Sequence, residues 1–255
     1  MIKISHLVKQ YKNTTAVNGI NLEIPEGEFF GFLGPNGAGK TTTIKMMVGL
    51  LKPTAGTITV DGHDILQSPV QAKSVLGYIP DRPFIYEKLT GREYLDFIGA
   101  LYEMDPRLAT DRGERFLEFF DLAEVSDELI EAYSHGMKQK LVISGALLHD
   151  PKVLVVDEPM VGLDPKGARQ VKELFMDLCR KGASIFMSTH SLGIAQAMCG
   201  RIGIIQKGKV IALGTVEELR QQARADHEHL EDIFLELTGD THLERLFHPL
   251  ETLTG

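Results

Sequence analysis

Eight residues near the start of this chain have the types and spacing needed to hold a phosphate group. Residues 34–41, GPNGAGKT, fit the pattern G-x-x-x-x-G-K-[ST] at every fixed position. The glycines let the backbone turn tightly enough to aim successive N–H groups at phosphate oxygens. Lys40 can then reach the β- and γ-phosphates, and the Thr41 hydroxyl can hold Mg²⁺. The segment predicts phosphate contacts at Asn36, Gly37, Ala38, Gly39, Lys40, Thr41 and Thr42.

The residues on either side of this loop support the prediction. Residues 29–33, FFGFL, form a short apolar run typical of a buried strand, and residues 41–51 have the pattern of a helix. A helix that starts near Lys40 directs the positive end of its dipole at the same anion. A glycine-rich turn without a ligand is the alternative, and the strand–loop–helix setting argues against it.

Two acidic residues follow a second apolar run. Residues 153–156, VLVV, are typical of a strand covered on both faces of a parallel sheet, and Asp157 and Glu158 come directly after them. Asp157 suits a Mg²⁺ ligand, directly or through water. Because side chains alternate along a strand, we expect Glu158 to point away from Asp157 and to face an attacking water as general base. A solvated acid at a strand end is the alternative for Glu158.

A histidine ends the next predicted strand. Residues 184–189, SIFMST, are followed by His190, and neighbouring parallel strands end at the same edge of their sheet. We therefore expect the His190 imidazole to touch the γ-phosphate, with a structural or surface histidine as the alternative. The candidate catalytic residues are Glu158, His190 and Lys40.

The first 150 residues predict strands followed by a helical insertion. The first eighty have the pattern of strands and turns around one helix, with a turn at Asp61-Gly62. Residues 90–149 are helical in pattern and open with a capping box, Thr90 to Glu93. The chain is thus expected to be an α/β protein whose nucleotide-binding core is interrupted by helices.

Strands return in the last third of the chain. They are predicted over 153–156 and 184–188, with a helix over about 166–181 between them, which completes a βαβ unit. Residues 202–206 and 209–213 predict a hairpin around Lys207-Gly208. An apolar stripe in the tail is expected to pack on the core, with a partner-binding role as the alternative; it consists of Leu230, Ile233, Phe234 and Leu237.

Composition argues against several classes of protein. The formal net charge is -8 and the sequence pI about 5.6. The chain therefore has no overall positive charge that would attract nucleic acid or anionic lipid. No run approaches the roughly 18 apolar residues that cross a bilayer, and the first residues do not have the pattern of a secretion signal. Cys179 and Cys199 have no partner at metal-ligand spacing, which fits a reducing compartment. We expect a cytoplasmic protein that does not bind nucleic acid.

Taken in order with the phosphate loop and the acids, further segments resemble motifs of the ATP-binding cassette (ABC) ATPase family. Tyr11 lies upstream of the phosphate loop, where the family stacks an aromatic ring on adenine. Residues 133–137, YSHGM, fall where the family has its Leu-Ser-Gly-Gly-Gln signature, and residues 162–164, GLD, resemble its loop after the second acid. His190 matches the family's switch histidine. The resemblance covers roughly residues 1–220.

This resemblance implies a fold and its division. The family has a P-loop NTPase core with an inserted helical subdomain and an N-terminal antiparallel β subdomain. On this chain the ATPase domain is expected to span 1–239, with the nucleotide-binding core at 1–88 and 150–220 and the helical subdomain at 89–149. A helical tail is expected at 221–255. The implied cofactors are ATP and Mg²⁺.

The resemblance also implies a dimer. Ser134 offers a hydroxyl and Gly136 a backbone N–H at a helix N-terminus, which together form an anion site. In the family this site closes over ATP held by a second ATPase subunit, which we expect to be another copy of this chain. His135 and Met137 replace the family's Gly and Gln, so the contacts of those two positions are not carried over.

One position near the site departs from the family. Most members carry Gln where this chain has Asp81, within the segment LGYIPDRP at 76–83. In the family that Gln senses Mg²⁺ and the attacking water and links the ATP site to the membrane partner. An Asp can face Mg²⁺ through water, which places Asp81 beside Thr41 and Asp157 as a candidate metal ligand, or it can turn to solvent. Both interpretations stay open.

Two functions fit the family. The first is the ATPase subunit of an ABC transporter with transmembrane permease subunits on separate chains, held at the inner face of the cell membrane. Residues 83–90 would supply the apolar docking groove. The signature form and residues 230–235, LEDIFL, resemble bacterial export-type (ABC-2-like) systems.

The alternative is a soluble ABC ATPase acting on ribosomes or DNA. Such relatives usually carry two cassettes, long coiled-coil insertions or zinc-binding cysteines, and these 255 residues contain none of them. A phosphoryl-transferring kinase with a similar loop would leave residues 134–136 without an explanation. The sequence therefore favours the transporter subunit.

Overall fold

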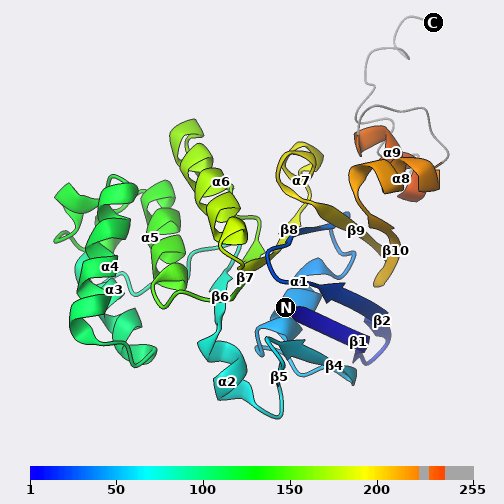
Figure 1. Ribbon diagram of the computed structural model, residues 1–255, viewed down its shortest axis with the longest axis horizontal. Coiled ribbons are helices and arrows are strands. Elements are labelled where there is room, and N and C mark those ends of the chain that lie inside the picture. The colour runs from blue at the N-terminus through cyan, green and yellow to red at the C-terminus, as the bar shows by residue number, and fades with distance from the viewer. Residues whose placement is uncertain (224–229, 239–255) are drawn as a thin grey trace, which may run out of the picture.

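Two sheets form the centre of the molecule in a computed structural model that describes residues 1–223 and 230–238 (Figure 1). The smaller sheet is antiparallel, has the order β2-β1-β4-β5, and consists of β1 (Ile2–Tyr11), β2 (Thr14–Ile24), β4 (Ala55–Val60) and β5 (His63–Asp64). The larger sheet has the order β10-β9-β3-β8-β7-β6. Its strands are β3 (Phe29–Leu33), β6 (Leu76–Ile79), β7 (Val153–Asp157), β8 (Ser184–Thr189), β9 (Arg201–Gln206) and β10 (Lys209–Gly214).

All neighbours in the larger sheet are parallel except β10, which pairs with β9 as the predicted hairpin. Alternate residues of its central strands enter two separate cores. Leu154 and Val156 lie in one apolar cluster, and Val153 and Val155 lie in the other. Residues 153–156 of β7 are all apolar because both faces of this strand are buried, as is usual in a parallel sheet.

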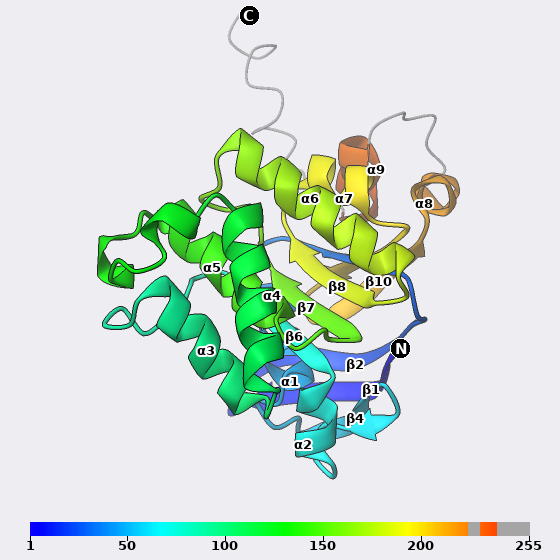
Figure 2. The same ribbon diagram turned by 60° about the vertical axis from the view of Figure 1, so that its left-hand side comes forward.

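Helices cover the two faces of this sheet differently (Figure 2). α6 (Pro165–Arg180) and α7 (Leu192–Met198) pack on one face through Phe175 and Ala195. α1 (Lys40–Met47) and the antiparallel sheet pack on the other, with Ile44 in the second core. The site-bearing strand ends are thereby held between two packed layers.

The predicted helical insertion forms one side of the molecule. It consists of α3 (Gly91–Leu101), α4 (Pro106–Phe119), two short 3₁₀ turns, η1 (Ala123–Val125) and η2 (Ile130–Ala132), and α5 (His135–Leu147). The capping box at its start is confirmed, since the Thr90 hydroxyl accepts from the Glu93 N–H and the Glu93 carboxylate accepts from the Thr90 N–H.

The prediction that the apolar stripe of the tail packs on the core is confirmed. α8 (Val216–Ala223) follows β10, and α9 (Leu230–Thr238) packs beside α7 with Leu230, Ile233 and Phe234 buried. The Gln206 side chain donates to the Thr238 carbonyl at 2.8 Å. Residues 224–229 and 239–255 of the predicted tail lie outside the described residues.

Two predicted elements need correction. The helix expected over 41–51 ends at Met47, because Gly49 takes a left-handed φ of +72° that no helix continues. The first eighty residues also contain a second helix, α2 (Pro69–Ser74), preceded by Ser68. Among its six residues only Ala72 is buried, so the sequence shows no apolar periodicity that would predict this helix.

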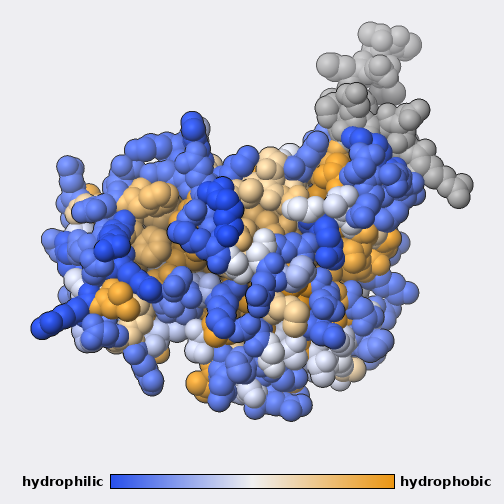
Figure 3. Space-filling model, viewed as in Figure 1, coloured by the Kyte–Doolittle hydropathy of each residue, from blue (hydrophilic) through white to orange (hydrophobic). Residues whose placement is uncertain are grey.

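The surface drawn in Figure 3 is mostly hydrophilic, with an apolar area over α5 and beside α6. A cleft of about 390 Å³ opens between α4 and α6, with Phe116, Phe119 and Leu174 among its lining residues. Within the described residues, no helix combines the length and apolar character needed to span a bilayer.

Candidate nucleotide site

The phosphate loop connects the end of β3 to the start of α1. Gly37 and Gly39 have φ values of +77° and +113°, which a side chain would strain. A Cβ on Gly39 would also lie only 2.5 Å from the Ala16 carbonyl oxygen. The Thr43 hydroxyl and N–H both bond to the Gly39 carbonyl, at 2.9 and 3.0 Å. The glycines are therefore required for a loop that turns into a helix N-terminus.

Lys40 folds back over this loop. Its Nζ donates to the carbonyl oxygens of Gly34 at 2.6 Å and Pro35 at 3.2 Å, and the residue is buried. Burial lowers the pKa of Lys40, while the carboxylates of Glu158 and Asp157 act in the opposite direction. The Lys40 ammonium thus lies between the loop and the carboxylates of Asp157 and Glu158, where it could bind a polyphosphate.

Asp157 ends β7 and is buried. Burial raises the pKa of its carboxyl, as do the Asp81 and Glu158 carboxylates, while hydrogen bonds from Ser188 and Thr41 lower it. The Thr41 hydroxyl and the Asp157 carboxylate are hard oxygen donors in contact, and such donors are the ligands Mg²⁺ prefers. The residues present therefore fit a magnesium ion.

Glu158 does not follow the predicted alternation along the strand. β7 ends at Asp157, and Glu158 has a left-handed φ of +49°. The alternation of side chains along the strand therefore ends at Asp157 and does not include Glu158. Its N–H still donates to the Ser188 carbonyl at 3.1 Å. Its carboxylate turns toward the end of β8, where Oε2 accepts from the Thr189 hydroxyl at 3.1 Å.

His190 binds the same carboxylate. Its backbone N–H donates to Glu158 Oε1 at 2.7 Å, and its ring Nδ1 lies 2.7 Å from the same oxygen. The His190 side chain is 66% exposed, whereas that of Glu158 is 18% exposed. A largely exposed ring therefore holds a mostly buried carboxylate at the surface of the site.

The sheet brings these residues to one edge. Leu33 pairs with Thr189 and Asp157 pairs with Ser188, so β3, β7 and β8 end side by side. Of the residues predicted separately, Glu158 and His190 are in direct contact, and Asp157 and Glu158 are close enough to Lys40 for their charges to act on its pKa. Ser188 and Thr189 were missed, and two hydroxyl residues directly before a candidate catalytic histidine were the available signal.

Tyr11 and Asp81 lie at the margins of the site. Tyr11 ends β1 with an exposed ring, and Lys9 Nζ lies 5.2 Å from the ring centroid. Asp81 follows β6, is exposed, and is close enough to Asp157 to raise its pKa. The carboxylate of Asp81 thus adds to the negative charge around Asp157.

The predicted signature lies apart from the phosphate loop. Ser134 is the N-cap of α5, and its hydroxyl accepts from the Met137 N–H at 3.3 Å. Gly136 lies in the first turn of that helix. In Figure 1, α5 and α1 are on opposite sides of β6 and β7. Ser134 and Gly136 therefore lie on a different helix from the phosphate loop of the same chain, although the start of α5 packs against the turn that follows Glu158.

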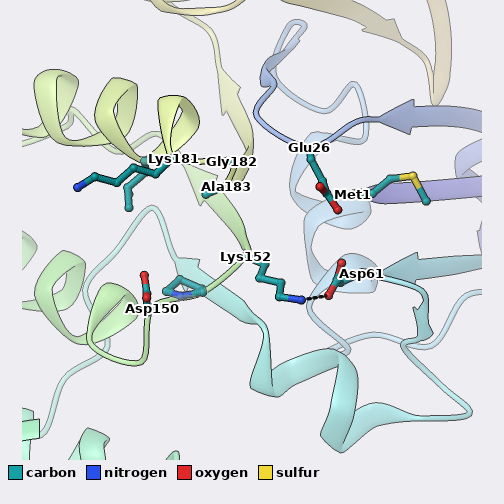
Figure 4. Close-up of a pocket in the computed structure, with 10 residues that line it drawn as sticks. Met1, Glu26, Asp61, Asp150, Lys152, Lys181, Gly182 and Ala183 are labelled. Atoms are coloured by element: carbon teal, nitrogen blue, oxygen red, sulfur yellow. Dashed lines mark hydrogen bonds and ion pairs between the residues drawn. The ribbon is translucent and has the colours of Figure 1, made fainter. Parts of the chain in front are cut away.

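Another cavity, of about 420 Å³, lies at the opposite edge of the sheet (Figure 4). Lys152 and Ala183, which precede β7 and β8, line it together with Glu26, and Lys152 Nζ pairs with Asp61 at 2.8 Å. Its lining residues include none of the predicted site residues. The predicted site residues on β7 and β8 lie at the other edge, where these strands end.

Known sequences resemble this chain over most of its length. The ABC transporter family profile matches residues 17–161. The linearmycin resistance ATP-binding protein LnrL of Bacillus subtilis is 38% identical over 226 residues, 89% of this chain and 73% of LnrL. The daunorubicin resistance ATP-binding protein DrrA3 of Streptomyces coeruleorubidus is 35% identical over 225 residues, 88% of this chain and 71% of DrrA3.

Solved structures share the fold. The ATP-binding subunit of an ABC transporter superposes with a TM-score of 0.89 at 32% identity, covering 93% of this chain and 99% of that one. The cassette MJ0796, a dimer in a post-hydrolysis state with ADP and Pi, gives a TM-score of 0.78 at 24% identity, covering 84% and 98%. A family match over more than half of its residues, with close relatives along most of its length, shows that this chain belongs to the ABC transporter family as an ATP-binding subunit that hydrolyses ATP.

Proposed function

We propose that this chain drives export through transmembrane permease subunits on separate chains, as one of two identical ATPase subunits that close over ATP. The observation that carries the proposal is the division of the site. Lys40, Asp157 and Glu158 lie at the sheet edge, whereas Ser134 and Gly136 lie on α5. In a dimer with two-fold symmetry, each copy places the start of its α5 at the sheet edge of the other copy. Such a dimer holds two nucleotides.

Each predicted residue has a role in that dimer. The phosphate loop binds the triphosphate, and Tyr11 stacks on adenine. Thr41 and Asp157 would hold Mg²⁺, with Asp81 acting through water, and a bound ion would supply positive charge beside the phosphates. Glu158 accepts a proton from the attacking water, while His190 fixes the carboxylate and faces the γ-phosphate. Domain limits of 1–88 and 150–220 for the core, 89–149 for the helices and 221–255 for the tail follow from the same assignment.

Export is supported by the names of the relatives. LnrL and DrrA3 are named for resistance to linearmycin and daunorubicin, and removal of a compound from the cell is one way to resist it. The reported relatives are ATP-binding proteins of this kind, which disfavours the ribosome or DNA alternative. We infer that this chain powers export of such compounds from the inner face of the membrane.

An exposed aromatic surface is available for the permease. Phe84 and Tyr86 are 85% and 63% exposed, and Tyr86 meets Phe97 of α3 edge-on, with ring centroids 5.3 Å apart. These residues follow Asp81 closely, so a helix docked on them would lie next to the nucleotide site. Exposed aromatic side chains are common anchors of protein interfaces.

Co-purification from detergent-solubilised membranes tests this function. Tagged protein should retain a permease with several apolar spans, and Phe84→Ser should lose it. Val70→Ser is the matched control, because Val70 of α2 is 75% exposed but lies outside the aromatic surface. Recovery of ribosomes or DNA in place of a permease would contradict the proposal, as would equal retention by the two variants.

A further inference from the structure

His135, which stands where the family has glycine, lies against the turn that follows Glu158. Gly162 in that turn has a φ of +81°, and a Cβ placed on it would overlap the His135 ring, with Nε2 only 2.5 Å away. The three atoms nearest to that position all belong to His135. The imidazole therefore fills the space that the absent side chain leaves.

The start of α5 holds the same turn at further points. A Cβ on Gly136 would lie 3.0 Å from the Gly162 carbonyl oxygen. Gln139 Nε2 donates to the Pro159 carbonyl at 3.5 Å, and Lys140 Nζ lies 3.9 Å from Asp164 Oδ1. The signature end of α5 and residues 159–164 are thus packed together within one subunit.

The turn leads back to Glu158 in a short run of bonded backbone. The Val161 N–H donates to the Glu158 carbonyl at 3.3 Å, and the Leu163 N–H donates to the Met160 carbonyl at 3.4 Å. Glu158 in turn binds His190. Gly162 therefore directly follows a hydrogen-bonded turn of four residues, 158–161, that begins at Glu158.

We propose that His135 is a positioning residue that couples the signature to Glu158 of its own subunit. When Ser134 and Gly136 close on the nucleotide of the partner, the imidazole transmits that movement to the turn and sets the carboxylate for hydrolysis. The inference rests on the proposed dimer. A glycine at this position offers no side chain for the contact, so the coupling through a ring is a property of this chain.

A double-mutant cycle in the full chain tests this. His135→Gly should lower kcat by about tenfold with little change in KM, since a small misplacement of a reacting group is enough. Gly162→Ala should lower kcat further than His135→Gly does, because the added Cβ overlaps the His135 ring. The double variant should recover part of the kcat lost in Gly162→Ala, since the added Cβ then occupies the space that the His135 ring has left. Gly62→Ala controls for backbone strain, because Gly62 has a φ of +83° with nothing within 4 Å.

Rescue separates positioning from packing. His135→Phe keeps a planar ring over Gly162 and should hold kcat within a factor of about three of the original chain. Thermal unfolding is recorded for every variant. Additive effects on kcat, or a coupling seen only in the melting temperature, would overturn the proposal. Ser134→Ala run in parallel reports on the dimer contact itself, so failure of the dimer and failure of the His135 coupling give different results.

Discussion

The ring Nδ1 of His190 and Oε1 of Glu158 lie 2.7 Å apart, although 31 residues separate them in the chain. The contact exists because β7 and β8 are parallel neighbours whose ends are in register at Asp157 and Ser188. A backbone N–H and a hydroxyl hold the same carboxylate. Glu158 is therefore fixed in place before any water arrives, as a general base requires.

Glu158→Gln should keep ATP binding and slow hydrolysis by about 10²-fold or more, because the amide keeps the shape of the side chain and cannot take a proton. Equilibrium binding of a fluorescent ATP analogue and steady-state phosphate release measure the two quantities. Turnover at the original rate would exclude the base role.

Ser134→Ala should weaken ATP-driven dimerisation by about 2 kcal/mol, roughly 30-fold, because a hydrogen bond to a charged phosphate is lost. Nucleotide affinity of the monomer should stay nearly unchanged, since Ser134 lies on α5, apart from the phosphate loop of its own subunit. Analytical ultracentrifugation gives the first value and titration calorimetry of dilute protein the second. A parallel fall of both would place Ser134 in the site of its own subunit.

Asp81→Asn should raise the Mg²⁺ concentration needed for half-maximal hydrolysis several-fold and strengthen binding of Mg²⁺-free ATP. Both effects follow from removing one negative charge near Asp157. Glu26→Gln is the control: it removes the same charge at the opposite edge of the sheet, beside Lys152 (Figure 4). Identical Mg²⁺ titrations of the two variants would mean that Asp81 turns to solvent.

His149 should make the protein less stable in acid. Burial lowers the pKa of its imidazole to about 4, from an ordinary value of 6.5. The unfolded chain therefore binds one proton more between these values, and stability is lost as the pH falls through this window, by about 3 kcal/mol at most. The ring stacks on Tyr102 with centroids 3.6 Å apart, so His149→Phe keeps the packing.

Urea unfolding of the original chain and of His149→Phe at pH 7 and pH 4.5 measures this contribution. The variant should gain stability relative to the original chain at the lower pH only. Neither ring nitrogen of His149 makes a well-aligned hydrogen bond, although the Leu76 backbone lies close enough to favour protonation slightly. An equal loss of stability in both proteins would assign the acid sensitivity to other groups.

Much of the site could be predicted because its residues follow short local rules. The phosphate loop is one contiguous segment, and Asp157, Glu158 and His190 each follow an apolar strand, so parallel strand ends were enough to bring them together. The capping box of α3 and the turn at Lys207-Gly208 are equally local, and both are confirmed.

The rest depends on backbone angles and long-range contacts that no local pattern encodes. Glu158 leaves the extended region one residue before the alternation rule expected, and only the turn to residues 159–164 explains it. The contact between His135 and Gly162 joins two residues that are 27 positions apart in the chain. Helix α2 is too short and too exposed to show a period.

Nucleotide stoichiometry in the trapped dimer tests the shared site most directly. Native mass spectrometry of Glu158→Gln with ATP should show two chains with two ATP molecules, and adding Ser134→Ala should lower the fraction of this dimer at the same protein concentration. A monomer that binds one ATP and, in the original chain, hydrolyses it at full rate at every dilution would contradict a site completed by a second copy.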